Sequence, residues 1–452
     1  MNLEKVMNEF VDDYMKRGVY ASREELLNVL EEVKVIVSAN KDKTPEEIID
    51  IMFEKNIKEL EELRQKYPVP GYTASINVDN INVKLYGGNI NYLGEPMPDN
   101  ALFDIASMTK FYTQAVAYNL IKEGVFSYTD KIKDLDPRFV NVGDLTVEDV
   151  LTFTTEFRTD GRISDKKTID EAKDTLYKVN VVGTGKYNYN DIGMITMKEV
   201  MEHVTGAKYE DLVDKYLIKP LNLKDTHLIV PNNKYHLLTG SPNVKYGKVN
   251  DMTALSLGGY SGHAGMFASS SDLIKLMRGV HHNDIVPNIS DAYTHGVNVA
   301  RGVMGNTYTT HPDGLDYTYL DKTEVDDSFV IQGSTRVNAT GSLDSAHNIL
   351  FNPSSMGVER AKEENEKLNM RRAEKGQNPL QLVKRFEFDR DGKLVNYDLI
   401  DPRQLFPSAK IEQVIKSNAE ATLKLRFLNK LIKEYDKNYN HEINITKQGQ
   451  SK

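Results

Sequence analysis

The sequence contains no cysteine, no excess of positive charge and no long apolar run. The absence of cysteine excludes disulfides, cysteine-ligated zinc, iron–sulfur clusters and thiol nucleophiles, so any covalent chemistry must use another nucleophile. The formal net charge is -9, from 57 Lys and Arg against 66 Asp and Glu. Such a chain has no overall attraction to nucleic acid or to an anionic membrane. Small molecules or peptides are therefore the expected partners.

No apolar segment approaches the length of a transmembrane helix, and the N-terminal residues lack the basic head, apolar centre and cleavage site of an export signal. As written, the chain is expected in the cytoplasm, unless it is the processed or trimmed form of an exported protein. A protein without cysteine also suits an extracytoplasmic setting, so the compartment stays open.

Length and composition are those of a globular protein. The chain has 452 residues, 40% of them hydrophobic and 27% charged, which suits two or three domains or one large domain with additions. Helical spacing of apolar residues, with Ser22 and Glu25 in the pattern of a capping box, predicts a helical N-terminal extension over residues 1–66. We expect this extension to be dispensable for chemistry. Residues 438–452 are predicted to form a polar tail that does not order itself.

Between these ends, strand patterns occur both early and late in the chain, at 72–78, 83–86, 328–332, 336–343 and 348–352. A long, mostly helical middle separates the two groups. A charged helical stretch (358–375), a hairpin turning at Asp391-Gly392 and a helix (409–435) follow. Because the two groups of strands must meet in one sheet, residues 67–437 are predicted to form one α+β domain.

Ser107 and Lys110 stand at the head of an apolar helical segment, in the order Ser-Met-Thr-Lys. Residues three apart share one face of a helix, so the amine can reach the hydroxyl. A desolvated lysine can help activate a serine nucleophile, and a helix N-terminus offers N–H groups to an oxyanion. The alternative is an N-capping serine with a solvated lysine. The apolar neighbours of Lys110 disfavour that alternative.

Two loops add further candidates. Tyr189 lies in the polar aromatic segment 186–193, where a phenol can act as a base if a nearby lysine lowers its pKa; a packing role is the alternative. His263 lies in the glycine-rich segment 257–267. A histidine among glycines favours a hydrogen-bonded structural role.

Taken in this order, these elements resemble the serine β-lactamase and penicillin-binding-protein superfamily, specifically the branch of class C β-lactamases, DD-peptidases and related esterases. The resemblance covers residues 67–352 and rests chiefly on segment 103–110, on Tyr189-Asn-Asp191 and on segment 258–267. It implies a β-lactamase-like fold, an antiparallel sheet flanked by helices with a helical subdomain. It implies no metal and no organic cofactor.

The resemblance also implies a role for each motif residue. Ser107 matches the nucleophile that forms an acyl-enzyme, Lys110 the partner that activates it, and Tyr189 the proton shuttle. Asp191 stands where the family has asparagine. A carboxylate can still pair with Lys110, but it no longer donates a hydrogen bond to a substrate carbonyl unless protonated. A second departure is Phe153-Thr-Thr-Glu156, in place of the family's His-Thr-Ser-Gly.

The family's last motif, Lys-Thr-Gly or His-Thr-Gly on a strand at the pocket edge, has no clear counterpart. By position it falls within residues 332–341. Either Gly333-Ser334-Thr335-Arg336 fills this role, with Arg336 as the cation that binds a carboxylate, or Ala339-Thr340-Gly341 does so without a cation. We favour the first, although a surface ion pair on a strand explains Arg336 equally well.

The sequence therefore predicts a serine hydrolase of the β-lactamase and penicillin-binding-protein type, acting through an acyl-enzyme on amide or ester bonds. We favour a DD-peptidase (a carboxypeptidase) or a D-amino-acid esterase with peptidoglycan- or teichoic-acid-related substrates. A general small-acyl esterase or a β-lactamase is the alternative. A non-catalytic binding module that retains the fold is a further alternative, motivated by the departures at Asp191 and in the last motif.

Overall fold

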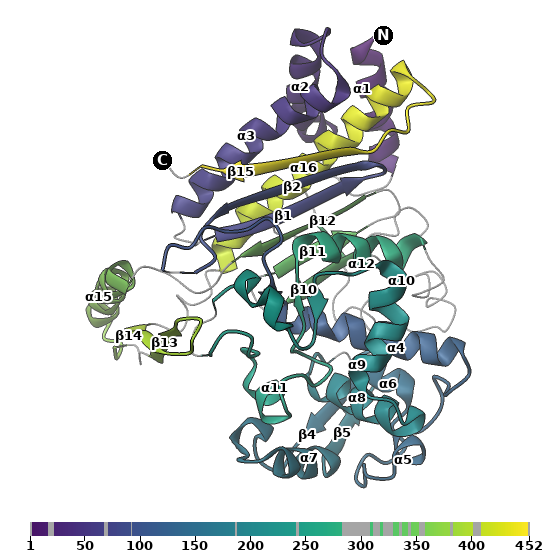
Figure 1. Cartoon of the computed structure of the whole chain (residues 1–452), viewed down its shortest axis with the longest axis vertical. Coiled ribbons are helices and arrows are strands. Elements are labelled where there is room, and N and C mark those ends of the chain that lie inside the picture. Colours follow the sequence, from purple (N-terminus) through teal and green to yellow (C-terminus); the bar gives the residue numbers. More distant parts are fainter. Residues whose placement is uncertain are drawn as a thin grey trace.

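The computed structural model describes residues 2–16, 22–66, 71–91, 93–185, 188–240, 244–282, 308–310, 317–319, 329–333, 337–341, 345–351, 358–379, 383–400 and 408–450. This part of the chain forms a central sheet, with helices on both faces, above a helical subdomain (Figure 1). The predicted α+β class is thus confirmed. No helix within these ranges combines the length and apolar character needed to cross a membrane.

The central sheet joins the early and late strands, as the sequence predicts. Its order is β10-β11-β12-β1-β2-β15. The bounds are β10 Phe329–Gly333, β11 Val337–Gly341, β12 Ser345–Phe351, β1 Gly71–Val78, β2 Ile81–Gly88 and β15 Ile443–Gly449. β1 lies at the centre of this arrangement, antiparallel to both β2 and β12.

The prediction of an unordered polar tail is wrong, because β15 pairs in parallel with β2 and forms an edge of the sheet. Backbone pairing satisfies the N–H and C=O groups of a strand whatever its side chains. Ile443 is buried against the helices of one face, and Lys447 pairs with Asp50 at 2.8 Å and with Glu54 at 3.0 Å. The polarity of this segment therefore suits an edge strand covered by charged helices.

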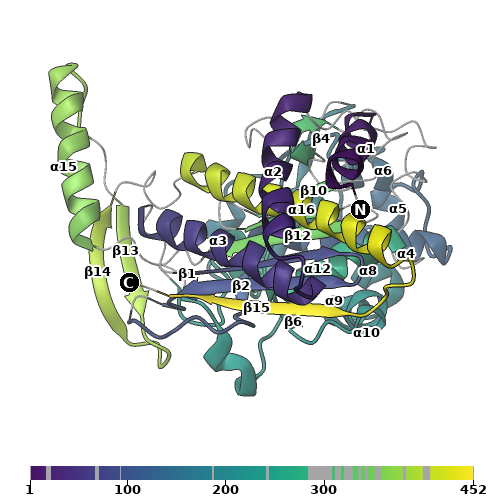
Figure 2. The ribbon, with the colours of Figure 1, turned by 90° about the horizontal axis from the view of Figure 1, so that it is seen from above.

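Four helices cover one face of the sheet, and we call them the back layer (Figures 1 and 2). They are α1 Leu3–Lys16, α2 Arg23–Ala39, α3 Pro45–Lys66 and α16 Ser408–Tyr435. Their apolar side chains share one core with β1 and β2, as Leu26, Phe53 and Phe427 do with Ile76 and Leu85. The extension is helical as expected, and its apolar side chains share a core with the sheet. The domain boundary at residue 66 stays a prediction.

The opposite face of the sheet is covered by α12 (Ser270–His282). Here the contacts are polar and buried. Ser75 of β1 lies 2.7 Å from the hydroxyl of Ser270, and Asn348 of β12 donates from Nδ2 to the Ser270 carbonyl at 2.7 Å. These hydrogen bonds hold the start of α12, and with it the loop that precedes α12, against the sheet.

The helical subdomain is built around α4 (Thr109–Lys122) and α8 (Ile192–Thr205). Shorter elements surround them: α5 Ile132–Leu135, α6 Val147–Leu151, α7 Ile169–Tyr177, α9 Tyr209–Val213, α10 Lys219–Leu221, α11 Met252–Ser256, β4 Thr155–Arg158 and β5 Asn180–Thr184. A small sheet, β3 Phe103–Asp104, β7 Phe267–Ala268 and β6 Thr226–His227, leads into α4. The chain enters α4 at the edge between this subdomain and the central sheet.

A separate arm consists of α15 (Val358–Glu374) and the hairpin β13 (Val383–Phe388) and β14 (Leu394–Ile400), which project to one side in both views (Figures 1 and 2). The hairpin turns at Asp391-Gly392, as predicted, and Arg390 beside this turn pairs with Glu95 at 2.8 Å. A short hairpin, β8 Tyr308–Thr310 and β9 Tyr317–Tyr319, completes the described strands.

Candidate active site

Ser107 lies in a tight turn, η1 (Ala106–Met108), between β3 and α4. Ala106 has φ 49°, in the left-handed region that an alanine occupies only under strain. Neighbouring groups hold this conformation: the Ala106 N–H donates to Asp104 Oδ1 at 2.9 Å, and the Ile105 N–H donates to the Met266 carbonyl at 3.0 Å. The strained turn presents Ser107 at the head of the α4 helix.

Ser107, Lys110 and Asp191 form a continuous polar chain. Lys110 Nζ donates to Ser107 Oγ at 2.9 Å and lies 2.7 Å from Asp191 Oδ1. The Lys110 side chain is only 5% exposed, whereas that of Asp191 is 46% exposed. The structure thus brings together three of the residues named from the sequence, with the lysine at the bottom of the site and the carboxylate facing solvent.

The electrostatics of this chain keep Lys110 charged. Burial alone would lower the pKa of Lys110, but the negative charge of Asp191 and the Tyr189 phenol outweigh burial and raise the pKa above its ordinary value. Lys110 also lies 3.5 Å from the His263 carbonyl. As an ammonium, Lys110 can donate hydrogen bonds and stabilise negative charge, but it cannot accept the proton of Ser107.

Tyr189 is the residue that the sequence analysis named for moving a proton. Its ring lies 4.8 Å from Lys110 Nζ and stacks on Phe153 with the ring centroids 5.3 Å apart. Phe153 is buried, has φ 52°, and its carbonyl accepts from the Asn188 N–H at 2.6 Å. Phe153, which departs from the family pattern, therefore stacks on the Tyr189 ring and holds it beside Lys110.

Asp251 is a site residue that the sequence analysis missed. Its Oδ1 lies 2.9 Å from His263 Nε2, and the other nitrogen of this buried ring lies 2.9 Å from Ser261 Oγ. Burial would raise the pKa of Asp251, but the hydrogen bond to His263, the charges of His263 and Lys110 and the Ala254 N–H together outweigh burial and lower the pKa to about 2. The only sequence signal was the position of Asp251 before a short helix, where its side chain accepts a capping hydrogen bond from the Ala254 N–H. That signal is common to many helices.

Asp191, Asp251 and His263 are the residues here that could bind a metal ion, because their ligand atoms all lie within 4.8 Å of one another. These groups already have partners. The Lys110 ammonium pairs with Asp191, and His263 pairs with Asp251. A metal ion at this position would have to compete with a buried ammonium for the same oxygen.

The loop that carries His263 is held in place by the helical subdomain. Gly262 has φ 84°, and a Cβ at this position would lie 2.6 Å from the Met194 carbonyl of α8, so only glycine fits. Thr113 of α4 donates to the Gly262 carbonyl at 2.6 Å, and its hydroxyl lies 2.6 Å from the hydroxyl of Tyr209. The loop is therefore fastened to both central helices.

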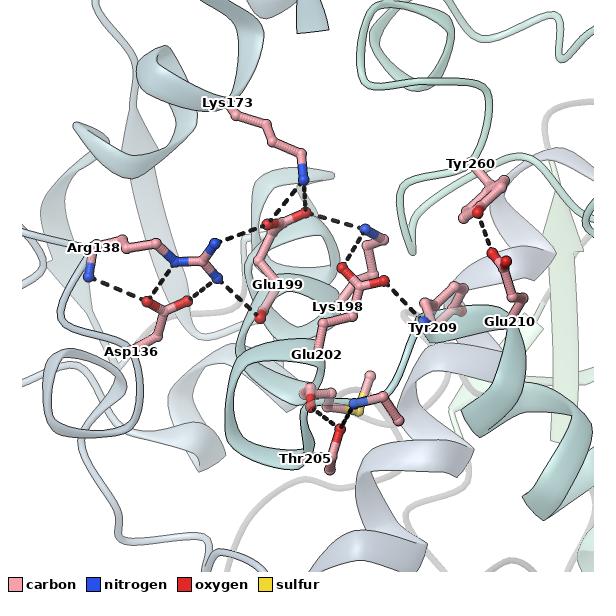
Figure 3. A network of polar contacts seen from close by, with 12 residues as sticks. Asp136, Arg138, Lys173, Lys198, Glu199, Glu202, Thr205, Tyr209, Glu210 and Tyr260 are labelled. Atoms are coloured by element: carbon pink, nitrogen blue, oxygen red, sulfur yellow. Dashed lines mark hydrogen bonds and ion pairs between the residues drawn. The ribbon is translucent and has the colours of Figure 1, made fainter. Parts of the chain in front are cut away.

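A buried ionic network extends this support (Figure 3). Glu202 of α8 accepts from Lys198 Nζ at 2.8 Å and from the Tyr209 N–H at 2.8 Å. Tyr260, at the start of the His263 loop, donates to Glu210 of α9. The hydrogen bond from Tyr260 to Glu210 holds the start of the loop that contacts Lys110, and Glu202 holds Tyr209 beside it.

The edge strand β10 contacts the turn that carries Ser107. The other candidate for the last motif, Ala339-Thr340-Gly341, lies on β11, one strand further from the sheet edge. Ser334, Thr335 and Arg336 lie outside the described residues, so their assignment to substrate binding stays a prediction.

The comparisons with known proteins agree with this arrangement. The family model described as Beta-lactamase matches residues 53–355. The chain belongs to the β-lactamase family. Among curated proteins, it is 26% identical over 218 residues to a proposed D-alanyl-D-alanine carboxypeptidase of Salmonella gallinarum, and equally so to one of Salmonella paratyphi B. Each match covers 40% of this chain, and the chain spans about half the length of these relatives (50%).

Solved structures share the fold at low sequence identity. One is the hydrolase EstCE1, whose title describes promiscuous acyltransferase activity (TM-score 0.53, 14% identity, 68% of this chain and 94% of that chain). A class C β-lactamase from Rhodobacter sphaeroides gives a TM-score of 0.52, 16% identity and coverage of 68% and 95%. An octameric penicillin-binding protein homologue from Pyrococcus abyssi gives a TM-score of 0.50 and 17% identity, and the match covers 75% of this chain and 86% of that chain.

Proposed function

We propose that this protein is a serine hydrolase that cleaves amide or ester bonds through an acyl-enzyme on Ser107. The observation that carries the proposal is the chain of contacts from Ser107 Oγ to the buried Lys110 ammonium at 2.9 Å and on to Asp191 at 2.7 Å. A buried lysine held against a serine in a strained turn is costly for stability and serves no packing purpose.

In this mechanism, Ser107 Oγ attacks the substrate carbonyl carbon, and its proton passes by way of Tyr189 to the departing amine or alcohol. The bond to the leaving group breaks, and the acyl group stays on Ser107. Water then cleaves the acyl-enzyme by the reverse path of protons. Lys110 stabilises the negative charge that develops near Oγ, and N–H groups at the head of α4 and on β10 are suited to hold the oxyanion.

The proposed substrates are small molecules or peptides of the cell-wall type, with a DD-peptidase or a D-amino-acid esterase as the favoured activities. The name of the Salmonella relatives supports a D-alanine-containing substrate, although each match covers only 40% of this chain. Asp191 weakens the resemblance to a β-lactamase, because the family's asparagine can donate to a substrate carbonyl and a carboxylate cannot.

The test is turnover and labelling of the parent and of Ser107→Ala. The parent should hydrolyse a p-nitrophenyl ester and react with a fluorescent penicillin, whereas Ser107→Ala should lose both by several orders of magnitude and keep its thermal unfolding midpoint. Hydrolysis by Ser107→Ala at the parent rate would refute the assignment. A parent that binds such ligands without any turnover or covalent adduct would instead identify a non-catalytic binding module.

A further inference from the structure

Asp191 compensates the charge of the buried Lys110 ammonium, and its side chain plays no part in capping α8. It stands at the N-cap of α8, yet its side chain makes no capping hydrogen bond. The neighbouring Asn190 does so, accepting from the Gly193 N–H at 2.9 Å. Asp191 instead directs Oδ1 to Lys110, and nearly half of its side chain remains open to solvent. The carboxylate is therefore held at the reaction centre and not at the helix terminus.

The distances place this carboxylate near any group next to the acyl carbon. Lys110 Nζ lies 2.9 Å from Ser107 Oγ and 2.7 Å from Asp191 Oδ1, so the carboxylate is no farther from Oγ than these two contacts combined. In an acyl-enzyme formed from an α-amino acid, the amino nitrogen is three covalent bonds from Oγ. A carboxylate has about four lone-pair sites, and the contact with Lys110 uses one of them.

Both carboxylates of the site are partly open to solvent, where a substrate cation could reach them. Asp191 and Asp251 are 46% and 36% exposed, whereas Lys110 is 5% exposed. His263 pairs with Asp251, and Lys110 pairs with Asp191, so each carboxylate already has one partner. An ammonium beside the acyl carbon of the substrate would be a second donor to the solvent-facing carboxylate of Asp191. An N-acylated substrate brings no charge, and its amide carbonyl finds no donor on Asp191.

We propose that Asp191 is a specificity residue that selects acyl donors with a free α-ammonium group, namely esters or amides of α-amino acids, over N-acylated donors. This inference rests on the proposed function. It separates the two favoured activities, because a DD-peptidase takes an N-acylated acyl donor and a D-amino-acid esterase takes a free one. The ammonium binds through a charge-assisted hydrogen bond and is unchanged by the reaction.

The experiment compares D-alanine p-nitroanilide with N-acetyl-D-alanine p-nitroanilide at pH 6.5, where the α-amino group is mostly protonated. The measured quantity is the ratio of the two kcat/KM values. We expect a ratio of about 10 or more in the parent, and a fall of about tenfold or more in Asp191→Asn, as expected for the loss of a charged hydrogen bond. The ratio cancels any general loss of activity caused by changing the partner of Lys110.

Asp174→Asn is the matched control. Asp174 also pairs with a lysine at 2.7 Å, Lys178, but on the exposed surface of α7, so the variant removes the same charge outside the site. It should keep the parent ratio. An equal fall in Asp174→Asn would show that net charge, and not Asp191, sets the preference, and would overturn the proposal.

Labelling by a neutral fluorophosphonate separates this proposal from the proposed function. Labelled Ser107 with a parent ratio near or below one, or with no hydrolysis of either anilide, would overturn the selection by Asp191 and leave the serine hydrolase standing. No labelling and no hydrolysis would overturn both. A parent ratio that collapses with EDTA and returns with Zn²⁺ would assign the carboxylates to a metal ion and also overturn the proposal.

Discussion

The central strand β1 presents different chemistry to the two faces of the sheet. Along β1, Ala74 and Ile76 point into the apolar core of the back layer, whereas Thr73, Ser75 and Asn77 are buried on the face that leads to the site. Apolar contacts are strong but non-directional, while hydrogen bonds fix orientation. Along β1, the side chains toward the back layer therefore contribute apolar burial, and those toward the site fix the position of α12.

The same contrast extends to the residues around Ser107. Lys110, Thr113 and His263 are buried, and each makes a polar contact of defined geometry. Phe53 and Phe427 in the back layer are equally buried but belong to an apolar core, where their side chains make no hydrogen bond. Substitutions on the two sides should consequently have different effects: loss of the fold in the back layer, and loss of activity with an intact fold at the site.

Deleting residues 1–66 should have the largest effect, because it removes α3 from β2 and β15 and uncovers the apolar side of α16 on which α1, α2 and α3 pack. We expect little or no folded monomer, measured by size-exclusion chromatography and circular dichroism. This outcome is the opposite of the expectation from the sequence, in which the extension was dispensable. A truncated chain that unfolds cooperatively and still labels at Ser107 would show that the back layer is an accessory.

Tyr189→Phe tests the site side. The substitution keeps the ring that stacks on Phe153 and removes only the hydroxyl of a partly exposed side chain, so the free energy of unfolding should change by less than about 0.5 kcal/mol. Turnover should fall by roughly 10²–10⁴-fold, as for loss of a proton-transfer group. In a double-mutant cycle with Lys110→Ala, additive losses would argue against a shared proton-transfer unit.

Phe53→Ala is the counterpart in the back layer. Phe53 is 0% exposed in the apolar core, so its truncation should cost about 3–5 kcal/mol of the free energy of unfolding, measured by urea denaturation. The kcat/KM of the molecules that remain folded should match the parent. Val35→Ala on the exposed side of α2 is the control and should stay within about 0.5 kcal/mol. An altered kcat/KM in Phe53→Ala would mean that the two sides are coupled.

Asp251→Asn should give the smallest effect, and one that depends on pH. The pKa of Asp251 is about 2 in the folded protein against 3.8 ordinarily, so its carboxylate stabilises the fold above pH 4 and this stabilisation is lost as the pH falls from 4 to 2. Partial exposure reduces the contribution to roughly 1 kcal/mol. Urea midpoints of parent and variant should differ at pH 5 and converge at pH 2. A difference that grows on acidification would contradict the sign.

Much of the fold could be predicted because it follows from local patterns. The strand at 72–78 and the helix at 409–435 were placed within a residue at each end, since alternation and helical spacing are visible in a single segment. β15 was not predicted, because a polar strand at a sheet edge takes its structure from a distant partner, β2, and not from its own composition. The packing of residues 1–66 was missed for the same reason.

The residues of the candidate site also fall into those that a sequence motif marks and those that only the structure brings to the site. Ser107, Lys110 and Tyr189 stand in sequence motifs and could be named in advance, and the structure places them together. Asp251 could not be named, because it reaches His263 from a loop and a short helix whose sequence carries only a capping signal. The importance of the stacking by Phe153 was likewise invisible, since the sequence shows only that the family's usual residue is absent.

The central claim is that Ser107 is the nucleophile, and peptide mapping after reaction with a fluorophosphonate tests it most directly. Cleavage by trypsin after Lys84 and Lys110 releases residues 85–110, a peptide whose only serine is Ser107. We predict that this peptide carries the adduct, on Ser107, and that denatured protein carries none. An adduct on any other peptide, with residues 85–110 unmodified in enzyme that has lost its activity, would contradict the account.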